Sequence, residues 1–268
     1  MANPPHGWEK KRRGSAFGAM PEAERADENL IEGKNAVAEA LRSGREIDKI
    51  LFSAASLKTV GHIVAEARRL GITAQECDRR KLDKLSATGA HQGVIAMCAA
   101  ADYKTLDDVL ALAESRGEPP LIVLCDCITD PHNLGAIIRT AEVSGAHGVM
   151  IPKRRSAGLN AACAKAAAGA LEHVPVVKCQ STLAAVQELK ERGVFVFAAD
   201  MGGRSMYGTD MTGACALVIG SEGEGISAGV RKEADFTVSI PQKGKIPSLN
   251  ASNAAAVLLY EIYRQRNV

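Results

Sequence analysis

The sequence contains no apolar stretch long enough to span a bilayer, which takes about 20 consecutive apolar residues. Its first residues, Met1 to Arg13, also lack the apolar centre of a secretory signal peptide. The seven cysteines are an odd, scattered set, and several lie within apolar runs, as expected of buried thiols in a reducing compartment. These absences predict a cytoplasmic protein that does not interact with a membrane.

A large excess of charge of one sign is also missing. With a formal net charge of +2, contact with nucleic acid would have to come from local basic patches and not from a bulk cationic field. The closely spaced pair Cys125-x-Cys127 has no second pair in the sequence, so no metal site is predicted.

Two common nucleotide-binding signatures are absent as well. No Gly-x-Gly-x-x-Gly follows the first strand of the second half of the chain, and there is no Walker A loop. The missing fingerprint weakens the interpretation of the chain as a nucleotide-dependent oxidoreductase.

The composition is that of an ordinary globular protein, with 46% hydrophobic and 24% charged residues in 268. This length can bury one large core or two small ones. Residues 1–29 are predicted to be a flexible tail, because the basic cluster Lys10–Arg13 and the mostly acidic segment Glu22–Glu28 show no apolar period. RNA contact by the basic cluster is the alternative.

Residues 30–101 predict a compact α/β module, with Asp102–Lys104 as a hinge to a second domain over residues 105–268. The backbone N–H groups near Gly33 and Lys34 would suit an RNA phosphate, although a plain helix cap explains them equally well. The expected elements are a helix beginning at Ile31–Lys34, strands at Ile47–Phe52, Ile72–Ala74 and Gly93–Cys98, and helices at Leu57–Leu70 and Arg80–Leu85.

The second domain opens with a strand, a polar turn and a helix. The apolar run Leu121–Leu124 predicts the strand, Asp130 occupies the position of an N-cap, and Pro131 that of the first helical residue. Ligands of parallel sheets bind where strand ends meet helix starts, so Asn133 and Arg139 could handle an anionic substrate. Taken alone, this segment favours an ordinary connection with a surface arginine.

The same order of strand, turn and helix recurs twice. The run Ala216–Ile219 leads into Gly220–Gly225, and Phe236–Pro241 leads through a loop to Ser248–Asn253 and a small-residue helix. Such alternation predicts a parallel sheet with helices on both faces. Further strands are expected at Val149–Ile151, Val174–Val177 and Val194–Ala198, and further helices at Leu106–Ala113, Leu159–Ala170, Thr182–Glu191 and Ser227–Glu233.

Together, the three segments resemble the motifs of the SpoU-type (TrmH-like) RNA 2′-O-ribose methyltransferases, in order and with similar spacing. Asn133 and Arg139 match the first motif, Gly220–Gly225 matches the Gly-x-Glu-Gly-x-Gly of the second, and Ser248-Leu249-Asn250 matches the third. The resemblance implies an α/β, SPOUT-type catalytic domain with a C-terminal trefoil knot. More weakly, the preceding module resembles an L30e-like substrate-binding domain.

The resemblance also implies a cofactor, S-adenosylmethionine. Backbone groups around Gly220, Ile240 and Leu249 would hold it, with Ser248 and Asn250 nearby. Glycines in the second motif would let the backbone approach the ligand closely. On spacing alone, a turn with positive φ angles explains them better.

Arg139 matches the residue most often given the catalytic role in this family. A guanidinium stays protonated, so the easier role for Arg139 is to grip the phosphate beside the target ribose and to stabilise a developing oxyanion. Glu222 would orient Arg139 or accept the proton late, although it could equally be a helix-start acid or an ion-pair partner. Asn133 would orient the ribose or join the loops of the knot.

Basic residues are candidates for RNA contact. Lys153, Arg154 and Arg155 follow a strand and therefore belong to the ligand side of the sheet, whereas Lys34 lies in the first module. A basic surface loop without function is the plainer explanation.

The alanine-rich last helix fits an intrachain core as well as a dimer seam, and the resemblance implies a homodimer.

We therefore expect an enzyme that methylates a ribose 2′-hydroxyl of structured RNA, most closely a guanosine of 23S rRNA, because family members that act on tRNA often lack the first module. Methylation of an rRNA adenosine or a tRNA guanosine is the alternative within the class. A non-catalytic RNA-binding relative is the alternative outside it, although the intact motifs weigh against that interpretation.

Overall fold

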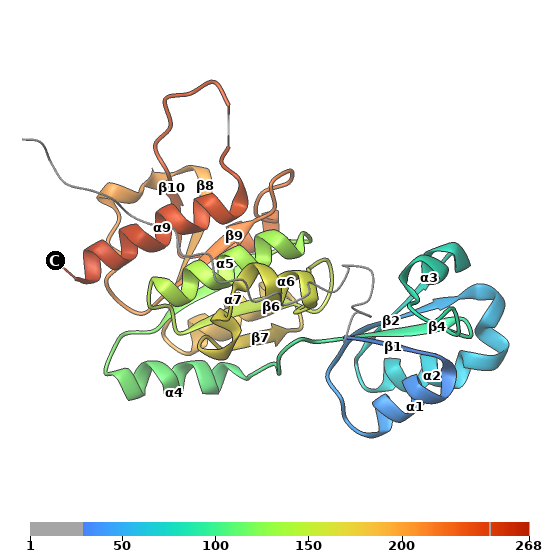
Figure 1. Ribbon diagram of the computed structural model, residues 1–268. Coiled ribbons are helices and arrows are strands. Elements are labelled where there is room, and N and C mark those ends of the chain that lie inside the picture. Colours follow the sequence, from blue (N-terminus) through green and yellow to red (C-terminus); the bar gives the residue numbers. More distant parts are fainter. Residues whose placement is uncertain (1–28, 247, 268) are drawn as a thin grey trace, which may run out of the picture.

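The computed structural model describes residues 29–246 and 248–267, which form an N-terminal and a C-terminal lobe joined by an extended segment (Figure 1). The tail expected over residues 1–29, with its basic cluster Lys10–Arg13, lies outside the described residues except for Asn29. Within the described ranges, every helix is too short or too polar to cross a membrane.

The N-terminal lobe is built on a four-stranded mixed sheet in the order β1-β4-β2-β3. Strand β2 (Ile47–Ser53) runs antiparallel to β4 (Val94–Cys98) and parallel to β3 (Thr73–Cys77). Helices α1 (Lys34–Arg42) and α2 (Leu57–Arg69) pack on one face of the sheet and bury the larger core of the lobe there.

The described residues cover only part of the other face of this sheet. Helix α3 (Arg79–Leu85) packs on it through a small core of Leu51, Leu82 and Ile95, on the side of the sheet away from α1 and α2 (Figure 1). Closer to the C-terminal lobe the same sheet carries the polar side chains of Lys49 and Thr73.

The expected helix start at Ile31 is wrong. Residues Leu30–Glu32 form strand β1, which pairs antiparallel with β4, and α1 begins only at Lys34 after Gly33 with φ 92°. Without β1, the outer backbone groups of β4 would lack partners, and satisfying them outweighs the local helical pattern.

The C-terminal lobe contains a six-stranded parallel sheet in the order β10-β8-β9-β5-β6-β7, as the alternating pattern predicted. Its strands are β5 (Leu121–Asp126), β6 (Gly148–Pro152), β7 (Val176–Cys179), β8 (Phe195–Ser205), β9 (Cys215–Gly220) and β10 (Phe236–Ser239).

Helices cover both faces of this sheet, because successive strand residues point in opposite directions into two separate cores. One face carries α5 (Pro131–Val143), α6 (Ala161–Ala167) and α9 (Ala251–Arg266). The opposite face carries α4 (Leu106–Arg116), α7 (Thr182–Glu191) and α8 (Ala228–Glu233).

The helix expected over Leu159–Ala170 is shorter in the structure. The side chain of Asn160 accepts a hydrogen bond from the backbone N–H of Cys163 and caps the start of α6. The helix ends at Ala167, because Ala168 and Gly169 adopt left-handed conformations with φ 50° and 90°.

The expected hinge is anchored between the lobes. The hydroxyl of Tyr103 donates to the carboxylate of Asp48 over 2.5 Å, and the Nζ of Lys178 donates to the same oxygen over 2.7 Å. The backbone N–H of Leu159 donates to the Tyr103 hydroxyl. Burial and the neighbouring carboxylate raise the pKa of Tyr103, which therefore stays a neutral donor. We call Asp48, Tyr103 and Lys178 the latch.

Candidate active site

All three motif turns lie at one edge of the six-stranded sheet, because parallel strands end on the same side. The last residues of β5 and β9, Asp126 and Gly220, are register partners. The predicted start of α5 is confirmed: the Asp130 carboxylate accepts from the backbone N–H of His132 over 3.0 Å, and Pro131 is the first helical residue.

Three motif residues meet in a polar cluster at this edge. The amide of Asn133 donates to Oε1 of Glu222 over 2.8 Å. The amide of Asn250 donates to Oδ1 of Asn133 over 3.0 Å and also to Oε1 of Glu222. These contacts join one residue from each motif around a single carboxylate oxygen. We call these three residues the amide–carboxylate cluster.

Asn250 also acts as the N-cap of α9. Its Oδ1 accepts from the backbone N–H groups of Ser252 and Asn253, while its amide belongs to the amide–carboxylate cluster. One side chain therefore fixes the start of the last helix and the position of the carboxylate of Glu222.

A pocket of about 500 Å³ lies beside the cluster, with an apolar floor and a wall of backbone and carboxylates. This volume is in the range of small-molecule sites. Of the residues expected to bind a cofactor, Gly220, Ile240, Ser248 and Leu249 line the pocket, whereas Asn250 lies in the adjoining cluster.

The wall of this pocket is a loop folded tightly on itself. Ser221 and Gly225 exchange two backbone hydrogen bonds of 3.2 and 3.0 Å. A Cβ on Gly220 would lie 2.3 Å from the carbonyl carbon of Gly225, so only glycine fits there. Such a closely folded backbone suits contact with a flat ring and a ribose. Asp200 also lines the pocket, where its carboxylate forms an ion pair of 2.9 Å with Arg231.

A second pocket of about 410 Å³ adjoins the first and shares Ser221–Glu224 and Ala251 with it. Its other lining residues include Cys127–Asp130, Asn133 and Arg155. Glu222 thus lies on the wall between two cavities, an arrangement that suits transfer of a group from one ligand to another. Within the described residues, no group of three or more His, Cys, Asp or Glu side chains is placed to hold a metal ion.

Asp126 is a site-supporting residue that the sequence analysis missed. Its carboxylate is buried and accepts from the Thr182 hydroxyl over 2.8 Å and from the backbone N–H of Ser227 over 2.7 Å. It thereby ties the end of β5 to the starts of α7 and α8. The available signal was an acidic residue at the end of an otherwise apolar strand.

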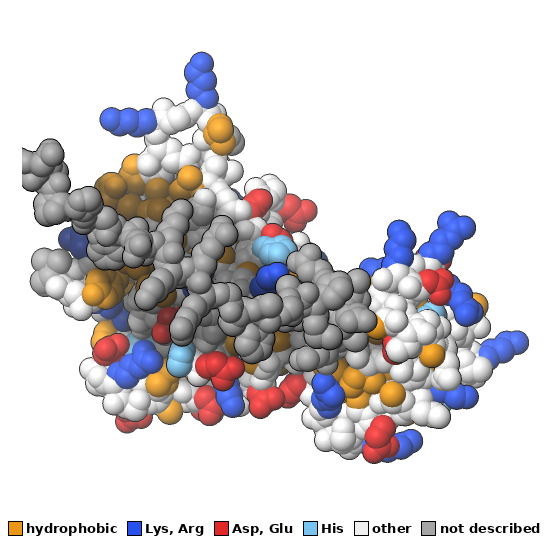
Figure 2. Space-filling view, in the orientation of Figure 1, with side chains coloured by type: hydrophobic (Ala, Val, Ile, Leu, Met, Phe, Trp, Pro, Cys, Tyr) orange, Lys and Arg blue, Asp and Glu red, His pale blue; other side chains and the backbone are white. Residues whose placement is uncertain are grey.

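Arg139 is not among the described residues that line either pocket. It is exposed on the outer side of α5 and makes no ion pair within the described part of the chain. Val143 on α5 and Val257, Tyr260 and Tyr263 on α9 are also exposed. Because α5 and α9 pack side by side, we call this surface the two-helix face. Figure 2 shows apolar side chains on the side of the lobe where Figure 1 draws α9 and β10.

The predicted RNA-contacting residues are not all in one place. Lys153, Arg154 and Arg155 follow β6 and line a cleft between the two lobes. Lys34 lies in the N-terminal lobe, and its backbone N–H donates to Oε1 of Gln92 over 3.1 Å. The first N–H of α1 is therefore satisfied within the chain, as a plain helix cap requires.

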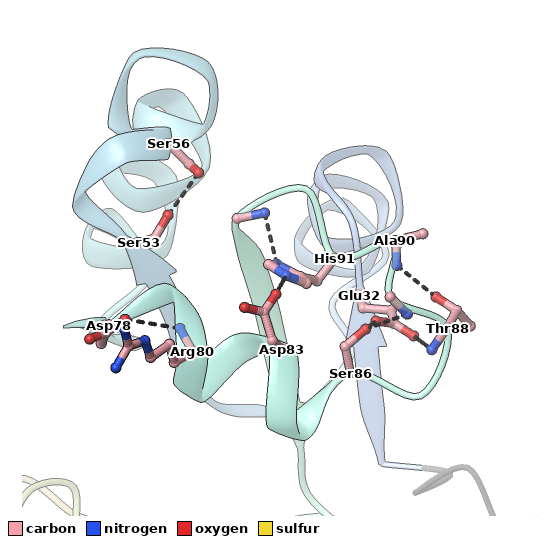
Figure 3. A network of polar contacts seen from close by, with 12 residues as sticks. Glu32, Ser53, Ser56, Asp78, Arg80, Asp83, Ser86, Thr88, Ala90 and His91 are labelled. Atoms are coloured by element: carbon pink, nitrogen blue, oxygen red, sulfur yellow. Dashed lines mark hydrogen bonds and ion pairs between the residues drawn. The ribbon is translucent and has the colours of Figure 1, made fainter.

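Two buried histidines have structural partners. In the N-terminal lobe, His91 contacts Asp83 through Nε2 and accepts from the backbone N–H of Gly93 at Nδ1 (Figure 3). In the C-terminal lobe, Nδ1 of His147 accepts from the backbone N–H of Leu121, at the sheet edge opposite the pockets. Neither histidine reaches the amide–carboxylate cluster.

Comparison with known proteins gives two family matches. Residues 120–260 match the SpoU rRNA Methylase family, and residues 30–104 match a family described as RNA 2'-O ribose methyltransferase substrate binding. These two ranges coincide with the C-terminal lobe that carries the pockets and with the N-terminal lobe.

Individual relatives agree with these matches. A Bacillus subtilis protein named as a TrmH family tRNA/rRNA methyltransferase, YacO, is 46% identical over 241 residues, which are 89% of this chain and 96% of that protein. The tRNA/rRNA methyltransferase slr0955 of Synechocystis is 40% identical, over 94% of this chain and 68% of its own.

Among solved structures, the SpoU methyltransferase AviRb of Streptomyces viridochromogenes in complex with AdoMet is similar with a TM-score of 0.57 and 28% identity. The match covers 93% of this chain and 95% of AviRb.

Proposed function

The chain belongs to the SpoU/TrmH family of RNA methyltransferases, and on that premise we propose that it transfers a methyl group from S-adenosylmethionine to the 2′-hydroxyl of a ribose in structured RNA. The observation that carries the proposal is the amide–carboxylate cluster at the wall shared by two pockets. A methyl donor bound in one pocket and a ribose hydroxyl bound in the other would meet beside Glu222.

The pocket lined by Gly220, Ile240, Ser248 and Leu249 is the one that we assign to the cofactor. S-adenosylmethionine would supply a methyl group attached to a sulfonium centre. The chain has to orient the hydroxyl, exclude water and manage one proton. The buried side chains of Val238 and Leu258 form an apolar floor that helps to exclude water.

Glu222 is our candidate for the proton acceptor. Both neighbouring amides donate to its Oε1, which orients the carboxylate. Oε2 accepts from none of the described residues and would accept from a hydroxyl in the second pocket. Asn133 would orient the ribose, because it lines that pocket and contacts the carboxylate. Asn250 would hold both partners in place.

We propose in addition that the chain is a homodimer that pairs through the two-helix face. Its exposed Val143, Val257, Tyr260 and Tyr263 are the kind of apolar and aromatic surface that subunit interfaces bury. Arg139 lies on the same face and outside the pockets of its own protomer, so pairing would carry its guanidinium towards the partner's site. There it would stabilise a phosphate or the 2′-oxyanion without losing its proton.

We assign the substrate to a guanosine of 23S rRNA and the enzyme to the cytoplasm. The match of residues 30–104 to a substrate-binding family supports an RNA substrate, and the match of residues 120–260 to the SpoU rRNA Methylase family favours rRNA. We also propose an L30e-like identity for that lobe and a trefoil knot in the C-terminal part. The knot would bring Gly220, Ile240, Ser248 and Leu249, which line one pocket, together from separate parts of the chain.

The test is to incubate the purified protein with methyl-labelled S-adenosylmethionine and separate unmethylated 23S rRNA, 16S rRNA and tRNA. Modified riboses are then mapped by their resistance to alkaline cleavage. Label at one 23S guanosine is the expected result, with Glu222→Ala as the inactive control. Label at an adenosine or in tRNA would overturn the substrate assignment, and RNA binding without any label would overturn the enzyme.

A further inference from the structure

A cleft of about 450 Å³ separates the two lobes and carries an excess of positive charge. Of the described residues that line it, one is a carboxylate, Asp48, and five are cationic, which are Lys49, Lys153, Arg154, Arg155 and Lys178. Cationic clefts of this kind concentrate polyanions, because nearby fields add within a confined volume.

The latch neutralises Asp48, the one carboxylate among the described residues that line the cleft. Asp48 is bonded to Lys178 over 2.7 Å, and its side chain is only 9% exposed. Within the described residues, Lys49, Lys153, Arg154 and Arg155 form no ion pair, so these four cations remain available to a ligand. The latch also holds the two walls of the cleft together.

The wall formed by the N-terminal lobe is a polar strip on the sheet surface. Lys49 of β2 is the register partner of Thr73 of β3, and Gln75 lies two residues further along β3. Side chains two residues apart on a strand point to the same face. An ammonium, a hydroxyl and an amide in one strip match the oxygens of a sugar–phosphate backbone.

The opposite wall is the loop after β6. A Cβ on Gly71 would lie 3.9 Å from the Nζ of Lys153, so this ammonium reaches the turn before β3 in the other lobe. Arg155 has φ 54°, a backbone conformation that residues other than glycine adopt rarely. Arg155 lines both the cleft and the second pocket beside Glu222.

We infer that the cleft between the lobes is the path of the substrate RNA backbone, and that Arg155 holds the phosphodiester at the point where the path enters the second pocket. The strand would cross the Lys49–Gln75 strip and pass Lys153 and Arg154. The target ribose would then turn in beside Glu222. This inference rests on the proposed function, because it names the surface that delivers the RNA to the same site.

The test measures the affinity of the full chain for a labelled 23S rRNA transcript by filter binding at several salt concentrations. Lys49→Ala and Arg155→Ala are each expected to raise Kd about tenfold and to reduce the slope of log K against log salt by about 1, as the loss of one phosphate contact does. Lys58→Ala on α2 and Arg116→Ala at the end of α4 are matched controls at exposed positions that do not line the cleft.

Equal Kd and equal salt slope for the cleft variants and the controls would overturn the inference. Binding of S-adenosylmethionine, measured by calorimetry, should be the same in all four variants, because none of these residues lines the cofactor pocket. If the wild-type protein transfers no methyl group but the cleft variants still lose RNA affinity, the enzyme proposal fails and the RNA path stands. If the wild-type protein transfers methyl groups but the cleft variants keep full RNA affinity, the RNA path fails and the enzyme proposal stands.

Discussion

Gly220→Ala is the substitution whose effect the structure determines most closely. The added Cβ would lie 2.3 to 2.5 Å from backbone atoms of Gly225 and Ile226, where ordinary contacts begin at 3.4 Å. The two arms of the loop would therefore have to separate by about 1 Å. Backbone cannot rotate out of the way as a flexible side chain can. Overpacking of this kind costs about 1–3 kcal/mol of folding free energy.

The same displacement would disturb the chemistry. Glu222 lies two residues beyond Gly220, and a 1 Å misplacement of a positioned group costs about 100-fold in rate. We expect Gly220→Ala to lower Tm by about 4–8 °C, for a loss of about 2 kcal/mol in a chain of this size. Binding of S-adenosylmethionine should weaken and methyl transfer should fall about 100-fold.

The matched control is Gly223→Ala in the same loop. A Cβ there meets no atom within 4 Å, and the residue does not need a positive φ. This variant should keep its Tm within about 1–2 °C of the wild type. Thermal melts by circular dichroism and calorimetric titration with S-adenosylmethionine compare the two. Equal Tm and equal affinity for Gly220→Ala and Gly223→Ala would refute the packing argument.

Three further predictions follow from other contacts. Glu222→Ala should abolish methyl transfer but cost no more than about 1 kcal/mol of stability, because water replaces its exposed hydrogen bonds. Glu222→Gln keeps an acceptor oxygen but should still lower kcat about 100-fold or more. Full activity of Glu222→Gln would contradict the role of Glu222 as proton acceptor. Asp48→Asn leaves Lys178 without its charge partner, so we expect a loss of about 2 kcal/mol of folding free energy and faster trypsin cleavage between the lobes. An unchanged rate of proteolysis would count against the latch. Burial lowers the pKa of His147, although Glu118 opposes this, so the folded state binds that proton less readily than the unfolded state. Stability should be fully present above pH 6.5 and fall as the pH drops below it, by at most about 1.4 kcal/mol per pH unit. Melts between about pH 7.5 and 5.5 should show a steeper decline for the wild type than for His147→Gln, and parallel curves would refute this account.

Local patterns were sufficient to predict most elements of the C-terminal lobe. Asp130 and Pro131 mark the start of α5, and the helix over Thr182–Glu191 is observed with the predicted bounds. These features depend on capping and on apolar periodicity, both of which operate within a few residues of sequence. Patterns of this kind can therefore be read from the chain alone.

The remaining features could not be predicted from the sequence, because they depend on contacts between residues far apart in the chain. Leu30–Glu32 became a strand only because β4 offers partners more than sixty residues away in the chain. Asn133, Glu222 and Asn250 were named individually from the motif resemblance, but their mutual contact spans up to 117 residues. The position of Arg139 outside the pockets could not be foreseen from its place in the motif.

The parallel sheet gives the two edges of the C-terminal lobe different tolerance to changes in chain length. One added residue between Gly220 and Glu222 would carry the carboxylate away from both amides at once. The turns before β8 and β9, which contain Gly193 and Gly213, lie at the opposite edge, where added residues would leave the pockets unchanged. A reporter peptide or an extra RNA-binding module could therefore be inserted at those turns and leave the reaction intact.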